Sequence, residues 1–239
     1  MKQGKWGSAF LCYLLVIGVF TSVTFWGNRA ITAIAEKIPL ERSHTIVIDA
    51  GHGGEDGGAT SCSGKLESNF NLEIALKLND LMQLMGYDTK MIRTTDQSVY
   101  TQGDTIAAKK VSDLKQRVKI VNETENALLI SIHQNTFPQS QYHGAQVFYG
   151  PKGESSHLAE SLQMSFVETI NHGSNRKSKK ADGIYLMQHI NCTGILVECG
   201  FLSNPEEEYK LNSPEYQKKL CCVIAAVTAE FLEKGYANT

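Results

Sequence analysis

Short apolar strand patterns alternate with amphipathic helix patterns along most of this 239-residue chain. The first strand pattern is the β-branched run TIVIDA at 45–50, which a glycine stops. In the segment 68–85, apolar residues recur every three or four positions, as they do on one face of a helix. Because parallel strands need a long crossover connection, this alternation predicts right-handed strand–helix–strand units.

The same patterns continue to the end of the chain. We expect further strands at 87–93, 127–133, 145–149, 183–187 and 194–199, and further helices at 112–122, 155–170 and 214–234. The expected fold is therefore a single α/β domain: a mostly parallel twisted sheet of about six strands with helices on both faces. The chain length agrees with one domain, since a domain usually takes roughly 100 to 200 residues.

An uncharged stretch at 7–26 precedes this domain and follows Lys2 and Lys5. It is long enough to cross a bilayer as a helix, and the basic residues before it predict a cytoplasmic N-terminus. We therefore expect residues 1–35 to be a signal peptide or membrane anchor, 36–44 a linker, and 45–235 the functional domain on the outer side of the cytoplasmic membrane. A cleaved signal peptide and an uncleaved anchor both stay open, because Ala33-Ile34-Ala35 offers a small-x-small cleavage site.

The charge balance argues against a nucleic-acid partner. The chain has 23 basic and 25 acidic residues, and residues 1–35 contain three of the basic ones and no acidic one. The remainder therefore has 20 basic and 25 acidic residues, a net charge of −5. A nucleic-acid binder needs a basic surface, so we expect none.

Three residues able to bind metal or protons lie at or just past predicted strand ends: His52, His133 and Glu198. In open α/β sheets, ligands bind beyond the carboxyl ends of the strands, so we expect these side chains to converge. Two imidazoles and one carboxylate with an open fourth position are typical of a catalytic zinc site. Glu198 stands in the apolar run GILVEC, where a carboxylate needs a partner to offset its desolvation.

The carboxylate ligand of such a site has two candidates on the residues alone. Glu67 stands at the start of the predicted helix at 68–85, and Glu55 follows His52 at the His-x-x-Glu spacing of some zinc carboxypeptidases. The motif His-Glu-x-x-His is absent, which excludes the thermolysin-like class.

Six blocks of sequence resemble one enzyme family when they are taken in order. IVIDAGHGGEDGGA, LESNFNLEIALKL, MIRTTD, LLISIHQNTFP, HGAQVFY and LVECGFLSNPEE are similar to the zinc-dependent N-acetylmuramoyl-L-alanine amidases of the Amidase_3 family, over about residues 45–232. The resemblance implies one zinc ion per chain held by His52, Glu67 and His133, with Glu198 catalytic. It also implies that Asp49 and Asp56 shape the loop and that Arg93 and Arg117 support the site.

Within that family, ECGFLSNPEE and the membrane-proximal start are most similar to the germination-specific, spore-cortex type. This similarity implies a role in cortex maturation, in which the peptide is removed on the way to muramic-δ-lactam, in the space facing the cortex. The chain shows no wall-binding repeat, so an activating or delivery partner is also expected.

The expected reaction is zinc-dependent hydrolysis of the amide between N-acetylmuramic acid and L-alanine, with peptidoglycan as substrate. Two alternatives stay open. One is a zinc peptidase that acts within the stem peptide and uses Glu55 as a ligand. The other is a non-catalytic scaffold that binds the cell wall or regulates a partner.

Overall fold

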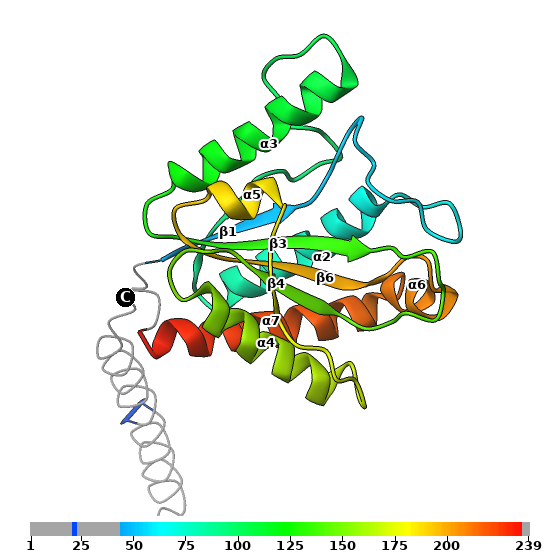
Figure 1. The fold of residues 1–239 in the computed structure, drawn as a ribbon. Helices are drawn as coiled ribbons and strands as arrows, with labels where there is room; N and C mark the ends of the chain where they lie inside the picture. Colours follow the sequence, from blue (N-terminus) through cyan, green and yellow to red (C-terminus); the bar gives the residue numbers. More distant parts are fainter. Residues whose placement is uncertain (1–20, 23–43, 236–239) are drawn as a thin grey trace, which may run out of the picture. The chain divides into compact units, whose positions relative to one another are not determined.

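Three parallel strands form the centre of a six-stranded sheet in a computed structural model of the protein, which describes residues 21–22 and 44–235 (Figure 1). They are β1 (Thr45–Ala50), β3 (Ala127–Asn135) and β6 (Thr193–Phe201). Their apolar residues are almost completely buried, as expected for strands covered on both faces. All three run in the same direction, so their carboxyl ends meet at one edge of the sheet.

The outer strands make the sheet mixed. β2 (Asp88–Met91) pairs parallel with β1, whereas β4 (Gln146–Tyr149) pairs antiparallel with β6. The two-residue β5 (Lys179–Lys180) pairs parallel with β4 and completes the order β2-β1-β3-β6-β4-β5. Four of the five pairings are parallel, which confirms the predicted mostly parallel sheet.

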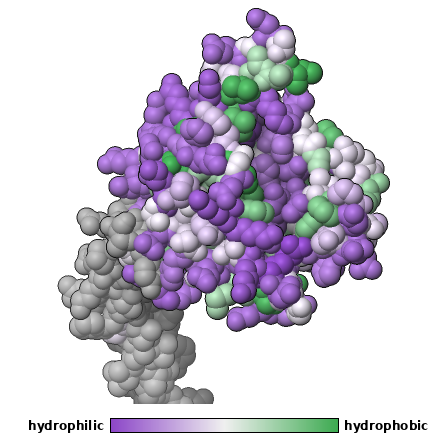
Figure 2. Space-filling model, in the orientation of Figure 1, coloured by the Kyte–Doolittle hydropathy of each residue, from purple (hydrophilic) through white to green (hydrophobic). Residues whose placement is uncertain are grey.

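Helices cover both faces of the sheet (Figure 1). One face packs against α2 (Glu67–Leu84), α4 (Ser155–Thr169) and α7 (Pro214–Glu233), and the other against α3 (Ile106–Asn122) and α5 (Tyr185–His189). Each face of the sheet has its own apolar core, and alternate strand residues point into one or the other. Ile46 and Ile48 point into the core under α2, α4 and α7, and Val47 into the core under α3 and α5. Over the described residues, the face in Figure 2 is mainly hydrophilic, with apolar residues in small scattered groups.

Two segments differ from the expectation. The segment 183–187 was expected to be a strand, but it forms the start of α5, because Leu186, Met187 and Ile190 are buried at helical spacing. The sheet edge is formed instead by β5, a few residues earlier. The short helix α6 (Pro205–Leu211), which was not predicted, begins where the Asn204 side chain accepts hydrogen bonds from two backbone amides of the first turn.

The predicted membrane segment at 7–26 lies outside the described residues except for Thr21 and Ser22. In the part of the chain that the structure describes, no helix has the length and apolar character needed to cross a membrane. Residues 44–235 belong to one compact unit. The division into 1–35, 36–44 and 45–235 stays a prediction.

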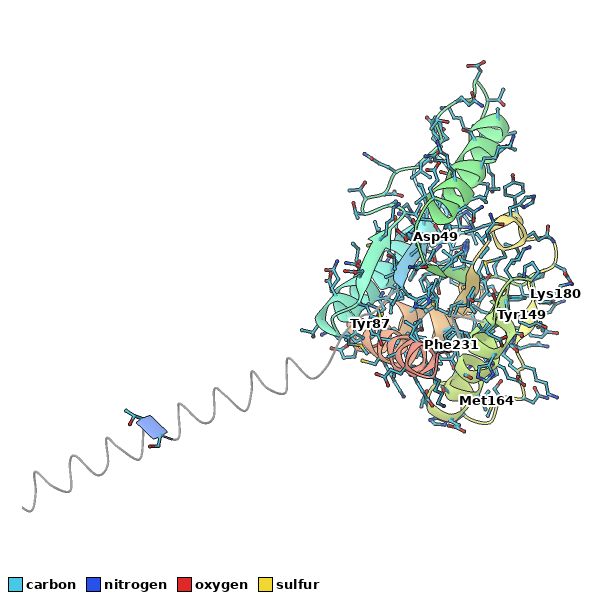
Figure 3. All side chains as sticks on the ribbon, turned by 90° about the vertical axis from the view of Figure 1, so that its left-hand side faces the viewer. Asp49, Tyr87, Tyr149, Met164, Lys180 and Phe231 are labelled. Atoms are coloured by element: carbon cyan, nitrogen blue, oxygen red, sulfur yellow. The ribbon has the colours of Figure 1, made fainter. Side chains whose placement is uncertain are left out.

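A buried ion pair joins β1 to α3. Arg117 Nη1 lies 2.5 Å from Asp49 Oδ1, and both side chains are almost fully buried. Ser131 on β3 donates a second hydrogen bond to Asp49, and Arg117 also binds Asp113 on its own helix. Burial opposes ionisation of Asp49, but Arg117, His133 and Ser131 together outweigh burial and keep the pKa of this carboxyl below its usual value. Asp49 lies inside the domain below α3 (Figure 3).

We predict that Asp49→Asn lowers the free energy of unfolding at neutral pH by about 3 to 5 kcal/mol, because it leaves Arg117 buried with one partner fewer. Because the folded pKa is lowered, this stabilisation is present above about pH 4 and is lost as the pH falls through the folded value. Urea denaturation should therefore show a difference from wild type that shrinks in acid. Asp88→Asn, at the exposed start of β2, is the control. Equal stability of both variants would contradict the role given to the ion pair.

Candidate metal centre

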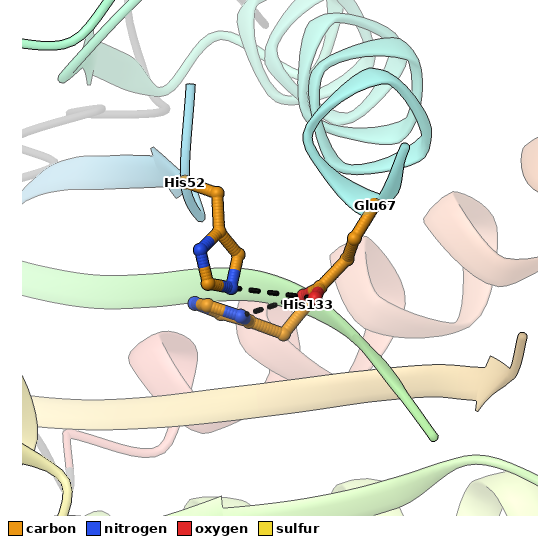
Figure 4. Close-up of side chains that lie close together, drawn as sticks. All are labelled: His52, Glu67 and His133. Atoms are coloured by element: carbon orange, nitrogen blue, oxygen red, sulfur yellow. Dashed lines mark hydrogen bonds and ion pairs between the residues drawn. The ribbon is translucent and has the colours of Figure 1, made fainter. Parts of the chain in front are cut away.

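His52, Glu67 and His133 converge at the carboxyl edge of the sheet, although 81 residues separate the first from the last in sequence. His52 follows β1, Glu67 is the first residue of α2, and His133 lies in β3. One ligand atom from each residue lies within 4.8 Å of the other two (Figure 4). The structure thus brings together the three residues that the resemblance named as zinc ligands.

The Glu67 carboxylate lies between the two imidazoles. Its Oε2 is 3.3 Å from His52 Nε2, and its Oε1 is 3.0 Å from His133 Nδ1 (Figure 4). The backbone amides of Ala59 and Gln134 also donate to this carboxylate, so its position is fixed from several sides. Burial opposes its charge, but the hydrogen bonds from the histidines outweigh burial and hold the pKa of Glu67 well below its usual range.

The second ring nitrogen of His52 is held by Asp56. His52 Nδ1 lies 3.0 Å from Asp56 Oδ2, and Lys110 on α3 lies 3.2 Å from the same carboxylate oxygen. Burial lowers the pKa of His52, but hydrogen bonds to Glu67 and Asp56 raise it above its usual value. A carboxylate on one imidazole nitrogen fixes the ring so that the other nitrogen faces the site, as in many metal centres.

Two glycines lack the side chain that would otherwise collide with the ligand residues. A Cβ atom at Gly51 would lie 2.2 Å from the ring of His133. At Gly58, which has a φ of 68°, a Cβ would lie 2.6 Å from Glu67 Oε2 and 2.8 Å from the His52 ring. The glycines of this loop therefore allow the backbone to approach the three ligand side chains closely.

Glu198 lies next to His133, since these two residues are partners in the β3–β6 register. Its Oε2 is buried and finds no hydrogen-bond partner among the described residues. Burial raises the pKa of Glu198 to about 7. A cavity of about 240 Å³ opens beside this carboxylate and is lined by both histidines, Glu198 and Tyr185 of α5. The group is thus poised to exchange a proton near neutral pH.

Glu55, the rival carboxylate, points elsewhere. Its side chain is 48% exposed and forms an ion pair of 2.7 Å with Lys109 on α3. In the described part of the chain it is not among the residues whose ligand atoms cluster.

Sequence reasoning missed Asn71. Its Nδ2 donates to Glu67 Oε1 and to the carbonyl of Gly51, and the side chain is fully buried. The available signal was its position four residues after Glu67, which places the two side chains on the same face of α2. Arg93 has a similar supporting role, because it donates to the carbonyls of Ala50, Gly51 and Ser68.

Comparison with known proteins agrees with this geometry. The family model Amidase_3, described as N-acetylmuramoyl-L-alanine amidase, matches residues 46–229. The chain belongs to this family. The germination-specific N-acetylmuramoyl-L-alanine amidase of Bacillus subtilis (strain 168) is 37% identical over 238 residues, which cover 98% of each chain. The family expected from the sequence is confirmed, and the chain is an N-acetylmuramoyl-L-alanine amidase by this membership.

Two solved structures of the family superpose on most of the chain. The CwlD amidase from Clostridioides difficile, in complex with the GerS lipoprotein, matches with a TM-score of 0.75 and 36% identity, over 79% of this chain and 98% of that chain. The N-acetylmuramoyl-L-alanine amidase from Clostridium difficile 630 matches with a TM-score of 0.69 and 29% identity, over 80% of this chain and 98% of that chain.

We predict that Glu198→Gln changes how the stability of the metal-free protein depends on pH. The folded pKa of about 7 lies above the usual 4.5, so ionisation of Glu198 lowers stability as the pH rises from 4.5 through 7. The amide does not ionise. The melting temperature of the variant, measured relative to wild type, should therefore increase between about pH 5 and pH 8. The exposed Glu160→Gln on α4 is the control. A difference independent of pH would contradict the raised pKa.

Proposed function

We propose that the protein hydrolyses the amide between N-acetylmuramic acid and the L-alanine of the peptidoglycan stem peptide, with one zinc ion held by His52, Glu67 and His133. The observation that carries this proposal is the convergence of two imidazoles on one buried carboxylate, beside an unpartnered Glu198. Three protein ligands of this type are typical of catalytic zinc, which keeps a further position open.

The residues fit a zinc ion. Each oxygen of the Glu67 carboxylate lies close to one histidine nitrogen. The glycines at 51 and 58 leave room for these three side chains. A bound zinc ion supplies Lewis acidity, which polarises a carbonyl group and makes a water molecule more acidic. Because Asp56 holds Nδ1 of His52, the Nε2 atom is the one directed to the metal.

Glu198 acts as the general base and acid in this proposal. Its pKa is about 7 in the metal-free protein, and in this proposal the carboxylate accepts a proton from the attacking water and returns it to the leaving amine of L-alanine. Its Oε2 is free of other hydrogen bonds within the described residues, so the proton can be taken without breaking a protein contact. The route needs no covalent intermediate with the protein.

We infer the biological role from the relatives. The Bacillus subtilis relative is named as germination-specific, which supports action in spore-cortex maturation and muramic-δ-lactam formation. This role places the domain 45–235 on the outer side of the cytoplasmic membrane, in the cortex-facing space, with the N-terminal segment as signal or anchor. The CwlD amidase was solved with a lipoprotein, which supports an activating or delivery partner here.

The function is tested by the products of digestion. Peptidoglycan is treated with the full-length protein, with and without zinc, and the muropeptides are identified by mass spectrometry. Muramic acid with a free lactyl carboxyl group and peptides that begin with L-alanine are expected only with zinc. Cleavage inside the stem peptide would favour the zinc peptidase, whereas a protein that binds peptidoglycan but no zinc would favour the scaffold.

The carboxylate ligand is tested by a matched pair of variants. Glu67→Ala should remove most bound zinc, because the metal loses one of three protein ligands that share a fixed geometry. Glu55→Ala should keep near one equivalent, since Glu55 pairs with Lys109 instead. Elemental analysis of the purified proteins measures the zinc bound per chain in each variant. An empty site in Glu55→Ala with a full site in Glu67→Ala would reverse the ligand assignment.

Glu198→Gln separates metal binding from catalysis. The amide keeps the size of the side chain but cannot accept the water proton, and general-base catalysis is typically worth about 10² to 10⁴ in rate. We therefore predict at least about a hundredfold loss in kcat with zinc content unchanged. Muropeptide release and metal content are measured on one preparation. A folded, zinc-loaded variant with near-normal activity would remove Glu198 from the mechanism.

A further inference from the structure

A second, larger cavity opens at β4, one strand beyond Glu198. It has a volume of about 810 Å³, and its lining includes Gln146 and Phe148 of β4, Phe201 at the end of β6, Lys179 of β5, and Arg176 and Lys177 just before β5. We call this cavity the basic groove. No acidic residue lines it, although the chain as a whole carries a net charge of −2.

The basic groove continues the row of residues that forms the reaction site. His133 of β3 is the register partner of Glu198 on β6, and Glu198 is the partner of Gln146 on β4. Register partners on neighbouring strands point to the same face of the sheet and lie about 5 Å apart. Gln146 therefore stands one strand beyond Glu198 on the face that carries His133.

The guanidinium of Arg176 is built into this groove. Its Nη1 donates to Gln146 Oε1 at 3.2 Å and its Nε donates to the carbonyl of His143 at 3.0 Å. The group lies over the ring of Phe201, 5.0 Å from its centre. These contacts fix the guanidinium, while Nη2 makes no hydrogen bond to any described residue.

No carboxylate of the described residues lies within ion-pair distance of the cations of the groove. Among the described residues, Arg176, Lys177 and Lys179 form no ion pair, whereas the next residue, Lys180, lies 3.5 Å from Asp182. The buried Glu207 attracts Arg176 electrostatically but forms no ion pair with it, and its Oε2 accepts hydrogen bonds from the backbone amides of Gly144 and Phe201. A half-buried guanidinium with no carboxylate within ion-pair distance is a cation that a ligand carboxylate can pair with.

We propose that the basic groove binds the stem peptide of the substrate, and that Arg176, assisted by Lys179, pairs with a free carboxylate of this peptide two or three residues beyond the scissile amide. This inference rests on the proposed function, because it takes the scissile amide to lie at the metal centre beside Glu198. With this contact, the charge of the stem peptide determines which substrates the protein prefers.

Distances along the peptide agree with this placement. Two to three extended residues span about 7 to 10 Å, which is longer than the step of about 5 Å from Glu198 to its register partner Gln146, whose side chain holds Arg176. The second residue of a stem peptide is a glutamate joined through its γ-carboxyl group, so its α-carboxylate is free unless it is amidated. Nη1 and Nη2 of Arg176 form a fork that can bind such a carboxylate through two parallel hydrogen bonds. A neutral glycan strand offers no charge for these side chains.

The test compares two muropeptide substrates that differ only in whether this α-carboxylate is free or amidated. For the zinc-loaded full-length protein, kcat/KM for the free acid should exceed that for the amide by about tenfold, the worth of one charge-assisted contact. Arg176→Gln should lose that preference through KM, and Arg176→Lys should keep part of it. Lys179→Gln should weaken it with little risk to the fold, because Lys179 is exposed.

Lys180→Gln is the matched control. Lys180 follows Lys179 directly, pairs with Asp182, does not line the groove, and lies at the outer edge of the domain (Figure 3). It should keep the wild-type preference. Calorimetric titration of the released peptide, as acid and as amide, gives a second readout that needs no catalysis.

The outcomes separate the two proposals. Equal kcat/KM for acid and amide in an active wild-type protein would overturn the basic groove as a carboxylate site and leave the amidase function in place. Loss of the preference in Lys180→Gln as much as in Lys179→Gln would also overturn it, because the effect would then be general charge. Absence of lactyl product from both substrates, with cleavage elsewhere in the peptide, would refute the proposed function itself.

Discussion

The site depends on one electrostatic constraint: Glu67 keeps a buried negative charge between two histidines. A carboxylate that is 4% exposed is costly unless its charge is met, and here His52 and His133 meet it from two sides while backbone amides meet it from others. The same arrangement that stabilises the metal-free protein presents two nitrogens and one carboxylate to a common point. A bound zinc ion would take the place of the shared protons between these groups, so metal binding and proton release are coupled.

The supporting structure fixes the ends of the strands where these residues lie. Arg117 joins Asp49 on β1 to α3 and also donates to the carbonyl of His52. Arg93 binds the carbonyls of Ala50 and Gly51 and the first turn of α2. Two buried guanidinium groups therefore hold the carbonyls at the start of the loop between β1 and α2. This explains how a glycine-rich loop, in which His52 has a φ of 60°, keeps a defined position.

The centre of the fold and most of the site could be predicted from the sequence, because strong patterns coincided there. The apolar run before His52, the one ending at His133 and the one containing Glu198 mark parallel strands whose ends must meet. The edge of the sheet was harder, since β5 has only two residues, both exposed, and carries no apolar signal. The choice between Glu55 and Glu67 needed the family resemblance, as spacing alone does not show that Glu55 turns toward Lys109. Asn71 was missed because the spacing of four residues from Glu67 is common on helices and does not show that the side chain also binds the carbonyl of Gly51.

The chain thus combines a reaction site with a neighbouring cavity of different chemistry, one anionic at its centre and the other cationic. We propose that His52, Glu67 and His133 together bind the zinc ion used in hydrolysis. The most direct measurement is anomalous X-ray diffraction at the zinc absorption edge from crystals of the zinc-loaded protein. We predict one strong peak bonded to these three side chains, with Glu198 facing it but not bonded. A peak bonded to Glu55, a peak with Glu198 in place of Glu67, or no peak at this position would contradict the claim.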